Sequence, residues 1–294
     1  MNKIGFLTIL LIFFTAFTVP AQSNFGISSA VEWDTHSLRA SISLDLVSAG
    51  IRLPSGRTHG EALLSSDYVN LIRADILNLQ VDSSSTIGDL LNRGELSMPE
   101  TERFALSAHN IPPALSPDMR RLISSHIVSL DTISAALLRH SRPAPIMRTL
   151  TPVSAAQYTG IIIIAADNLP VHGMRSSALA VPCLFPKIWD TNMDIIFERN
   201  MLDTQNKIMV RYAPPHSIFQ NNPSGLTAEL TAHVGERPLR IFARGVFGIN
   251  PTDLIIDHDD AMLIISSEAN RRLLSQGKVA IILNDSVLRN EFTR

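Results

Sequence analysis

The chain has very little cysteine. One residue, Cys183, occurs in 294, so an internal disulfide is excluded. Cys183 stands between Pro182 and Leu184, and we interpret it as a small buried hydrophobe. The alternative is a reactive thiol, but no histidine lies near it in the sequence to support that reading.

Charge is also scarce. Charged residues make up 18% of the chain, the net charge is −2, and the pI is about 6.5. Basic residues do not gather into runs with interleaved aromatics, so we predict no nucleic-acid-binding surface. With 45% hydrophobic residues, the composition is that of a folded protein with one large domain or two small ones.

The N-terminal segment reads as an export signal. Lys3 precedes an apolar stretch from Ile4 to Val19, and Ala21 provides the small residue that precedes cleavage. We predict a signal peptide over residues 1–21, with an uncleaved anchor as the alternative. Because no cysteine stands at the cleavage site, we expect a periplasmic protein that is not a lipoprotein and has no transmembrane span after cleavage.

We predict a helix-rich first half over residues 22–145. It opens with a strand in which Leu38, Ala40, Ile42, Leu44 and Leu46 share one face and Trp33 covers the core. A helical stripe runs over residues 58–79, with Thr58 and Glu61 at capping-box spacing. A second helix is expected over residues 116–138, with Ser116 as cap and Pro117 in the first turn. Residues 142–145, rich in proline, are either a linker or a loop within one domain.

We predict a β-rich second half over residues 146–294. Ile161 to Ile164 form a β-branched run that suits a strand buried on both faces. Residues 190–194 provide turn chemistry between two apolar runs, which indicates a β-hairpin. Further strands are expected at 208–213 and 238–247, with a short helix at 226–234 between them.

The end of the chain has the clearest local pattern. A strand at 252–256 is followed by Asp257 as a helix cap, by a helix that ends at Gly277, and by a strand at 278–283. This order predicts a β-α-β crossover, with an antiparallel return as the alternative. The expected fold class is therefore α+β: a mixed sheet with helices on it, and either two domains or one.

Possible metal ligands occur together at one place. Asp257, His258, Asp259 and Asp260 are residue types that bind Zn, Mn or Ca. Helix capping explains the same residues without a metal, because neighbours in a first helical turn point in different directions. The nine histidines are scattered, and none has the spacing of a helical zinc pair: His36, His59, His109, His126, His140, His172, His216, His233 and His258.

Other chemistry-bearing patterns have simpler interpretations. The hydroxyl run from Ser83 to Thr86 is expected to provide polar capping after the preceding helix, since no serine lies in a Gly-x-Ser-x-Gly elbow. The segment from Gly245 to Gly248 lacks the Lys-Ser/Thr pair of a phosphate loop. Five apolar positions of the first half either line a partner groove or form core: Leu63, Leu64, Leu122, Ile123 and Ile127.

The order of several motifs resembles a known family. Tyr158-Thr-Gly-Ile-Ile-Ile is followed by Pro182 through Phe185-Pro-Lys-Ile, and Val81-Asp-Ser-Ser-Ser-Thr follows the first long helix. Together with the closing strand, helix and strand, this order is similar to FlgP-type bacterial cell-envelope proteins over roughly residues 30–285. The sequence differs in lacking the lipobox cysteine and in reading Ile163-Ile-Ala-Ala at the strand end.

The resemblance implies an exported, non-catalytic α+β protein, in some members a component of assemblies around the flagellar motor. Our first hypothesis is therefore a structural or interaction protein of the cell envelope that binds protein partners or itself, with no catalytic residues, metal ligands or cofactor. The second is a periplasmic ligand-binding protein or metal-dependent enzyme that uses loops near His172, Asp190 and Asp257.

Overall fold

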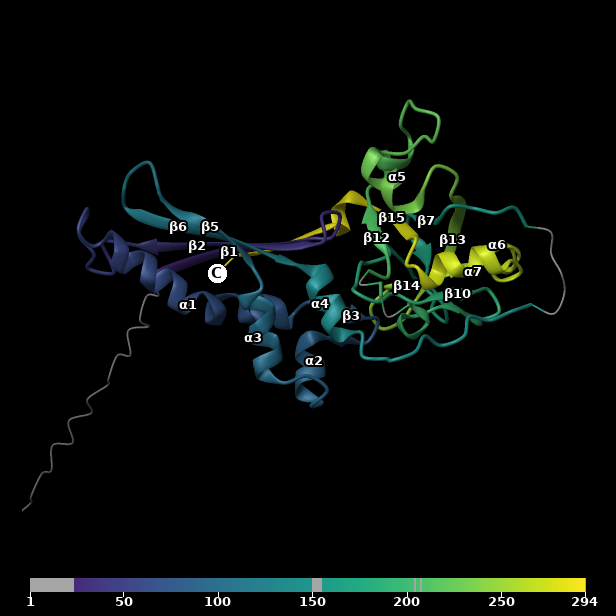
Figure 1. Cartoon of the computed structure of the whole chain (residues 1–294), viewed down its shortest axis with the longest axis horizontal. Coiled ribbons are helices and arrows are strands. Elements are labelled where there is room, and N and C mark those ends of the chain that lie inside the picture. Colours follow the sequence, from purple (N-terminus) through teal and green to yellow (C-terminus); the bar gives the residue numbers. More distant parts are fainter. Residues whose placement is uncertain (1–23, 150–154, 204, 207, 294) are drawn as a thin grey trace, which may run out of the picture.

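The protein has an α+β fold built on two sheets (Figure 1). A computed structural model describes residues 24–149, 155–203, 205–206 and 208–293; the predicted signal peptide over residues 1–21 lies outside them. The first sheet is antiparallel and has the strand order β16-β1-β2-β6-β5. Its strands are β1 (Phe25–Glu32), β2 (Ser37–Asp45), β5 (His109–Leu115), β6 (Arg121–Ser129) and β16 (Arg289–Thr293).

Among the described residues, helices cover one face of the first sheet and none covers the other (Figure 1). Figure 1 shows these helices beneath the sheet: α1 (Arg57–Leu77), α2 (Ile87–Asn92), α3 (Met98–Leu106) and α4 (Leu130–Leu137). The predicted face of β2 is confirmed, because Leu38, Ile42 and Leu44 are fully buried against α1 residues such as Leu64 and Ile72. Helix α1 follows Gly56, which makes no side-chain cap, so the predicted capping box at Thr58 is wrong.

A predicted helix at 116–138 is in fact a hairpin followed by a short helix. Strands β5 and β6 pair across the turn around Met119, whose φ is +58°, and α4 begins only at Leu130. Alternate residues of β6 are buried, which is strand periodicity. The apolar positions of residues 121–129 fit the helical period and the strand period alike. Pairing of β6 with β2 and β5 selects the strand. A real capping box follows the short strands β3 (Gln80–Asp82) and β4 (Ser85–Thr86), where Thr86 caps α2.

The second sheet is mixed and has seven strands in the order β11-β10-β14-β13-β7-β15-β12. Their bounds are β7 (Ile161–Ala165), β10 (Ile188–Asp190), β11 (Ile195–Phe197), β12 (Arg211–Ala213), β13 (Leu239–Phe247), β14 (Asp253–Ile256) and β15 (Val279–Leu283). Its helices are α5 (Ala228–Val234), α6 (His258–Ile265) and α7 (Glu268–Ser275). A small ribbon of β8 (Leu169–Pro170) and β9 (Ser177–Ala178), and the 3-10 turns Arg199–Met201, Pro215–Ile218 and Asp285–Val287, complete the elements.

Strand β7 is buried on both faces, as predicted. It pairs in parallel with β13 and β15. Ile161 and Ile163 belong to the main core, while Ile162 packs in a separate cluster under α5. The strand enters at Gly160, where an added Cβ would lie 2.4 Å from the carbonyl oxygen of Val234. Glycine is therefore required for the backbone to pass α5 this closely.

The predicted crossover at the end of the chain is wrong. Strand β14 is antiparallel to β13, while β13, β7 and β15 are mutually parallel. Strands β14 and β15 are therefore antiparallel, and β13 and β7 lie between them in the sheet. Helices α6 and α7 lie between them in the sequence. The predicted cap and C-terminal glycine are confirmed: Asp257 accepts a hydrogen bond from the amide of Asp259, and Gly277 has φ of +64°.

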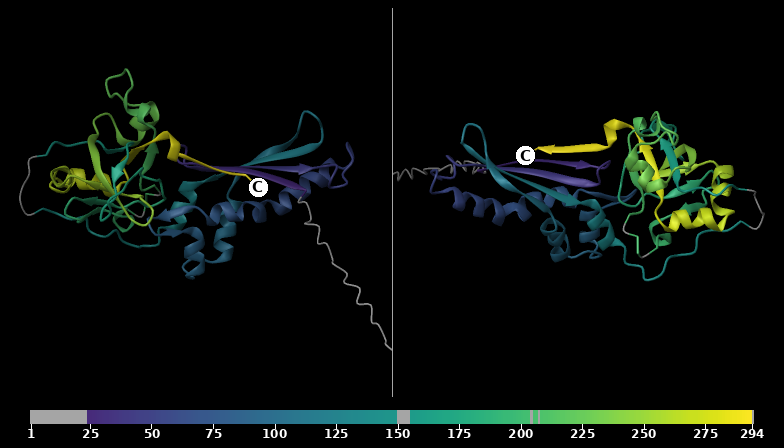
Figure 2. Two further views of the ribbon diagram at one scale, coloured as in Figure 1. Left: turned by 180° about the vertical axis from the view of Figure 1, so that it is seen from behind. Right: turned by 45° about the horizontal axis from the view of Figure 1, so that its top comes forward.

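The two halves are joined more closely than a division at residue 145 suggests. Strand β16, from the end of the chain, returns to pair with β1 in the first sheet (Figure 2). One hydrophobic cluster contains residues of both sheets. The backbone amides of Leu184 and Phe185 donate hydrogen bonds to the carbonyl oxygens of Gln80 and Val81, and these bonds join the two halves. The two sheets therefore share a core.

Candidate functional site

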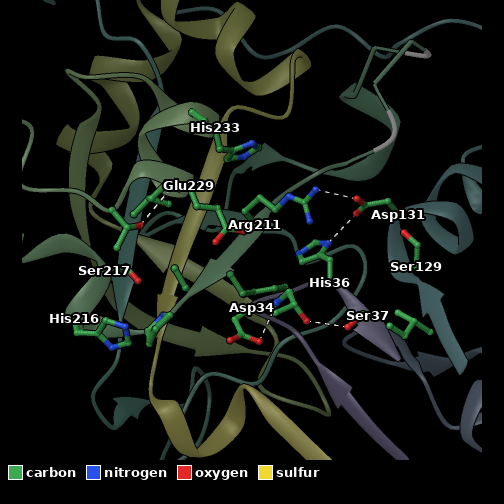
Figure 3. Close-up of a pocket in the computed structure, with 18 of the residues that line it drawn as sticks. Asp34, His36, Ser37, Ser129, Asp131, Arg211, His216, Ser217, Glu229 and His233 are labelled. Atoms are coloured by element: carbon green, nitrogen blue, oxygen red, sulfur yellow. Dashed lines mark hydrogen bonds and ion pairs between the residues drawn. The ribbon is translucent and has the colours of Figure 1, made fainter. Parts of the chain in front are cut away.

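A cleft of about 810 Å³ lies where the two sheets meet. Its floor is the end of the open face of the first sheet, where Ser37 and Ile127 lie beside Ser129. Strand β12, the turn at Pro215–Ile218 and helix α5 of the second half form the facing wall (Figure 3). Its volume is in the range of small-molecule sites.

The first half contributes the tight turn between β1 and β2. Asp34 and Thr35 stand exposed at its tip, and His36 is buried with a φ of +50°. A left-handed conformation is uncommon for histidine. Here it lets the carbonyl oxygen of His36 accept the amide of Leu130, which ties the turn to the start of α4.

An ion-pair bridge crosses the cleft between the halves. His36 Nδ1 lies 3.0 Å from Asp131 Oδ1, and Arg211 Nη2 donates to Asp131 Oδ2 at 2.8 Å (Figure 3). His36 and Asp131 come from the first half, whereas Arg211 stands on β12. The carboxylate of Asp131 therefore joins an imidazole of its own half to a guanidinium of the other.

Burial and charge set the protonation of this bridge. Burial is the main cause that lowers the pKa of His36, and the nearby Arg211 adds to it. Burial alone would raise the pKa of Asp131, but the hydrogen bond from His36 and the charge of Arg211 hold that pKa below its usual value. Asp131 is thus ionised at neutral pH and His36 is neutral, so Nδ1–H donates and Nε2 keeps a lone pair.

The remaining side chains make the cleft rich in acceptors. Thr227 caps α5, and Glu229 stands in the first turn of that helix. His233, further along α5, lies 3.1 Å through Nε2 from the carbonyl oxygen of Val279, and burial lowers its pKa. A carbonyl only accepts, so His233 donates through Nε2 and its Nδ1 is left as an acceptor.

Ser37 and His36 of the cleft do not form a hydrogen-bonded nucleophile and base. Ser37 follows His36 in the sequence, and its hydroxyl oxygen lies 2.8 Å from that of Thr35. Among the described residues, no hydrogen-bond partner reaches His36 Nε2. An activated hydroxyl needs a base within hydrogen-bonding reach, and among the described residues His36 is not bonded to Ser37 in this way.

Of the predicted site residues, the structure brings Asp190 and Asp257 to one edge of the second sheet. Strands β10 and β14 are parallel neighbours, so their carboxyl ends meet there. His258 Nδ1 lies 2.6 Å from Asp190 Oδ2, and this hydrogen bond is the main cause that raises the pKa of His258. Asp190 also accepts the amides of Asn192 and Asp194, which closes the predicted hairpin.

Asp257 makes a further contact, and the third predicted residue, His172, lies at the other end of β14. Asp257 pairs with Arg244 at 3.2 Å in addition to its capping bond. His172 stacks edge-on against Phe247, and Phe247 pairs with the first residue of β14, at the strand end opposite Asp257. Within the described ranges, no group of three or more His, Cys, Asp or Glu is arranged to hold a metal ion.

Cys183 is fully buried, and burial raises the pKa of its thiol. The phenol of Tyr212 donates to the backbone carbonyl of Cys183 and lies 3.1 Å from its amide nitrogen. Trp33 meets the ring of Tyr212 edge-on at 5.8 Å. The three residues therefore form part of the junction between the sheets, and the thiol is inaccessible.

Sequence reasoning missed the cleft. Its histidines are spread over almost 200 residues of sequence, and its walls come from elements that meet only in the folded chain. The one local signal is the pair of prolines after β12, which ends that strand at the cleft. None of the helices in the described part of the chain is long and apolar enough to span a membrane.

Comparison with known families gives two matches in chain order. Residues 24–136 match the model of the N-terminal domain of Treponema pallidum Tp0624, and residues 160–285 match that of its second domain. No curated protein matches the chain. The first match covers most of the first sheet with its helices, and the second covers the whole second sheet. The chain is therefore similar, sheet by sheet, to the N-terminal and second domains of Treponema pallidum Tp0624.

Proposed function

We propose that this protein is an exported, non-catalytic structural or interaction protein of the cell envelope, which binds protein partners or itself in the periplasm. Export rests on the signal-peptide pattern of residues 1–21. The absence of catalysis rests on the way the acidic and imidazole groups are used, since Asp131, Asp190 and Asp257 all serve hydrogen bonds that hold the fold.

The open face of the first sheet is the observation that carries this proposal. No helix of the described part of the chain covers it (Figure 1), and it bears apolar side chains on β5 and β6. Ile111 is 44% exposed, and Ile123 and Ile127 are half-buried on the same face, because Ile111 and Ser125 are cross-strand partners. Apolar side chains gathered on an uncovered face are typical of interaction surfaces.

The edges of the same sheet also bear on the proposal. Strand β5 is an edge strand that contains Pro112 and Pro113, and β16 is the opposite edge with Arg289 and Glu291. Proline and charge on edge strands oppose uncontrolled strand pairing. A partner is therefore expected to dock on the face and not to extend the sheet.

A finer part of the proposal concerns the assembly. The resemblance to FlgP-type proteins supports a complex associated with the flagellar motor. This part is tested by deletion of the gene, followed by measurement of motility and of envelope integrity.

The docking face is tested by a matched pair of substitutions. Ile111→Glu places a charge on the open face, whereas Ile249→Glu places it at a position that is 85% exposed in the second half. Sedimentation of the purified protein without residues 1–21, and crosslinking in the native envelope of cells that make the full chain, should show association that Ile111→Glu weakens and Ile249→Glu preserves. Equal melting temperatures would show that both variants fold. A monomer at high concentration that forms no crosslinks would contradict the proposal.

A second candidate function is ligand binding or metal-dependent catalysis at the Asp190 edge. The buried carboxylate of Asp190 orients His258, whose side chain is 42% exposed. Such a pair can present an oriented imidazole to a ligand. Thermal stabilisation by Zn²⁺ or Mn²⁺ that His258→Ala abolishes would favour this function over the first.

A further inference from the structure

The charges of the cleft do not balance. Asp131 and Arg211 neutralise each other across it. Asp34 and Glu229 remain, and neither has an ion-pair partner among the described residues. The cleft is therefore lined by three carboxylates, those of Asp34, Asp131 and Glu229, and by one guanidinium, that of Arg211.

The hydrogen-bonding groups of the cleft also favour a ligand that donates hydrogen bonds. His36 is 8% exposed, lines the cleft, and has an Nε2 atom without a partner in the described part of the chain. Its Nδ1–H is committed to Asp131, so Nε2 accepts. His233 likewise donates through Nε2 and accepts through Nδ1. The two carboxylates and the Nδ1 atom of His233 are therefore acceptors within the cleft, and the buried Nε2 atom of His36 is a further acceptor behind its wall.

We infer that this cleft binds an organic amine, a cation with several N–H donors, between Asp34 on the β1–β2 turn and Glu229 on α5. A protonated amine brings both the missing charge and the missing donors. The volume of about 810 Å³ accommodates a linear polyamine or a lysine side chain with its neighbours. This inference does not rest on the proposed envelope function, because it uses the cleft and not the open face.

Binding is measured by calorimetry and thermal shift on the protein that lacks residues 1–21. Spermidine is the first probe, in Hepes buffer at constant ionic strength, since Tris is itself an amine. Triethylene glycol is the uncharged control of similar length. Spermidine should bind and raise the melting temperature, and triethylene glycol should do neither. Equal effects of the two, or no effect of any amine, would overturn the inference.

A second probe separates the two sources of such an amine. Nα-acetyl-lysine methylamide presents the ammonium of a protein lysine. If it binds as well as spermidine, the cleft takes a lysine side chain of a partner; if only spermidine binds, the ligand is a free polyamine. Both outcomes support an amine site.

Matched variants locate the site. Glu229→Gln and Asp34→Asn should each weaken spermidine binding about two- to fivefold, because exposed charge pairs are worth little singly, and the double variant should weaken it more than either. Glu236→Gln is the control, since Glu236 follows the same helix but lines a separate hollow. Unchanged binding in the double variant, or an equal loss in the control, would refute the assignment to this cleft.

Discussion

At the scale of single residues, buried imidazoles make the fold sensitive to acid. Burial is the main cause that lowers the pKa values of His36, His126 and His233. Unfolded histidines take up protons near pH 6.5, whereas these three resist protonation until the pH is lower. The free energy of unfolding should therefore fall as the pH drops below about 6.5.

The urea midpoint at pH 7.5 and at pH 5.5 tests this. Each group contributes at most about 1.4 kcal/mol per pH unit, and His233→Gln should make the dependence shallower. His258 has the opposite sign, because its raised pKa favours the folded state below pH 6.5; its exposure makes that contribution small, and His258→Gln is measured in parallel. Stability that rises on acidification would contradict the prediction.

Asp257 provides a second test at this scale. Its carboxylate caps α6 and also pairs with the exposed Arg244. Asp257→Ala should cost about 0.5–2 kcal/mol in the free energy of unfolding. Asp257→Asn keeps a capping oxygen and loses the charge, so it should cost less. Urea unfolding of both variants separates capping from ion pairing, and equal losses would assign the effect to the charge.

At the scale of the element, β7 should reject a charge on either face. Ile162 and Ile163 point to opposite sides and are both fully buried. Ile162→Asp and Ile163→Asp each bury an unpaired carboxylate, and we expect neither variant to fold. Phe242→Asp is the control, because Phe242 stands on neighbouring β13 but is 65% exposed. Soluble yield and limited proteolysis of the three variants provide the measurement, and normal folding of either isoleucine variant would disprove burial on that face.

At the scale of the whole molecule, β16 links the end of the chain to its beginning. It pairs with β1 through residues 289–293, and Phe292 packs against the shared core. Removal of residues 289–294 should expose the edge of β1 and lower stability by about 1–2 kcal/mol, because Phe292 is only half-buried and full burial of such a side chain contributes about 1.5–3 kcal/mol.

Hydrogen exchange should locate this loss. Amides of β1 and β2 should exchange faster in the truncated protein, while those of β7 and β15, deep in the second sheet, should keep their protection. Equal loss of protection in both sheets would mean that the molecule unfolds as one unit, and no loss in either would mean that β16 is dispensable.

The sequence by itself determined the elements whose side-chain pattern matches one period only. The alternation in β2, the unbroken apolar run of β7 and the helix cap at Asp257 are local signals, and they could be recognised from neighbouring residues alone. The α+β class follows from those elements. Where apolar residues fit two periods, as in β6, local signals fail, and strand pairing with β2 made the choice.

Tertiary structure alone decided the strand order, the return of β16 and the cleft. The antiparallel placement of β14 and β15 depends on β13 and β7 inserting between them, which no local pattern records. Asp34, Asp131, Arg211 and Glu229 are far apart in sequence and face one cleft because two sheets share a core. Contacts between distant residues depend on how whole elements pack, and packing is a property of the complete chain.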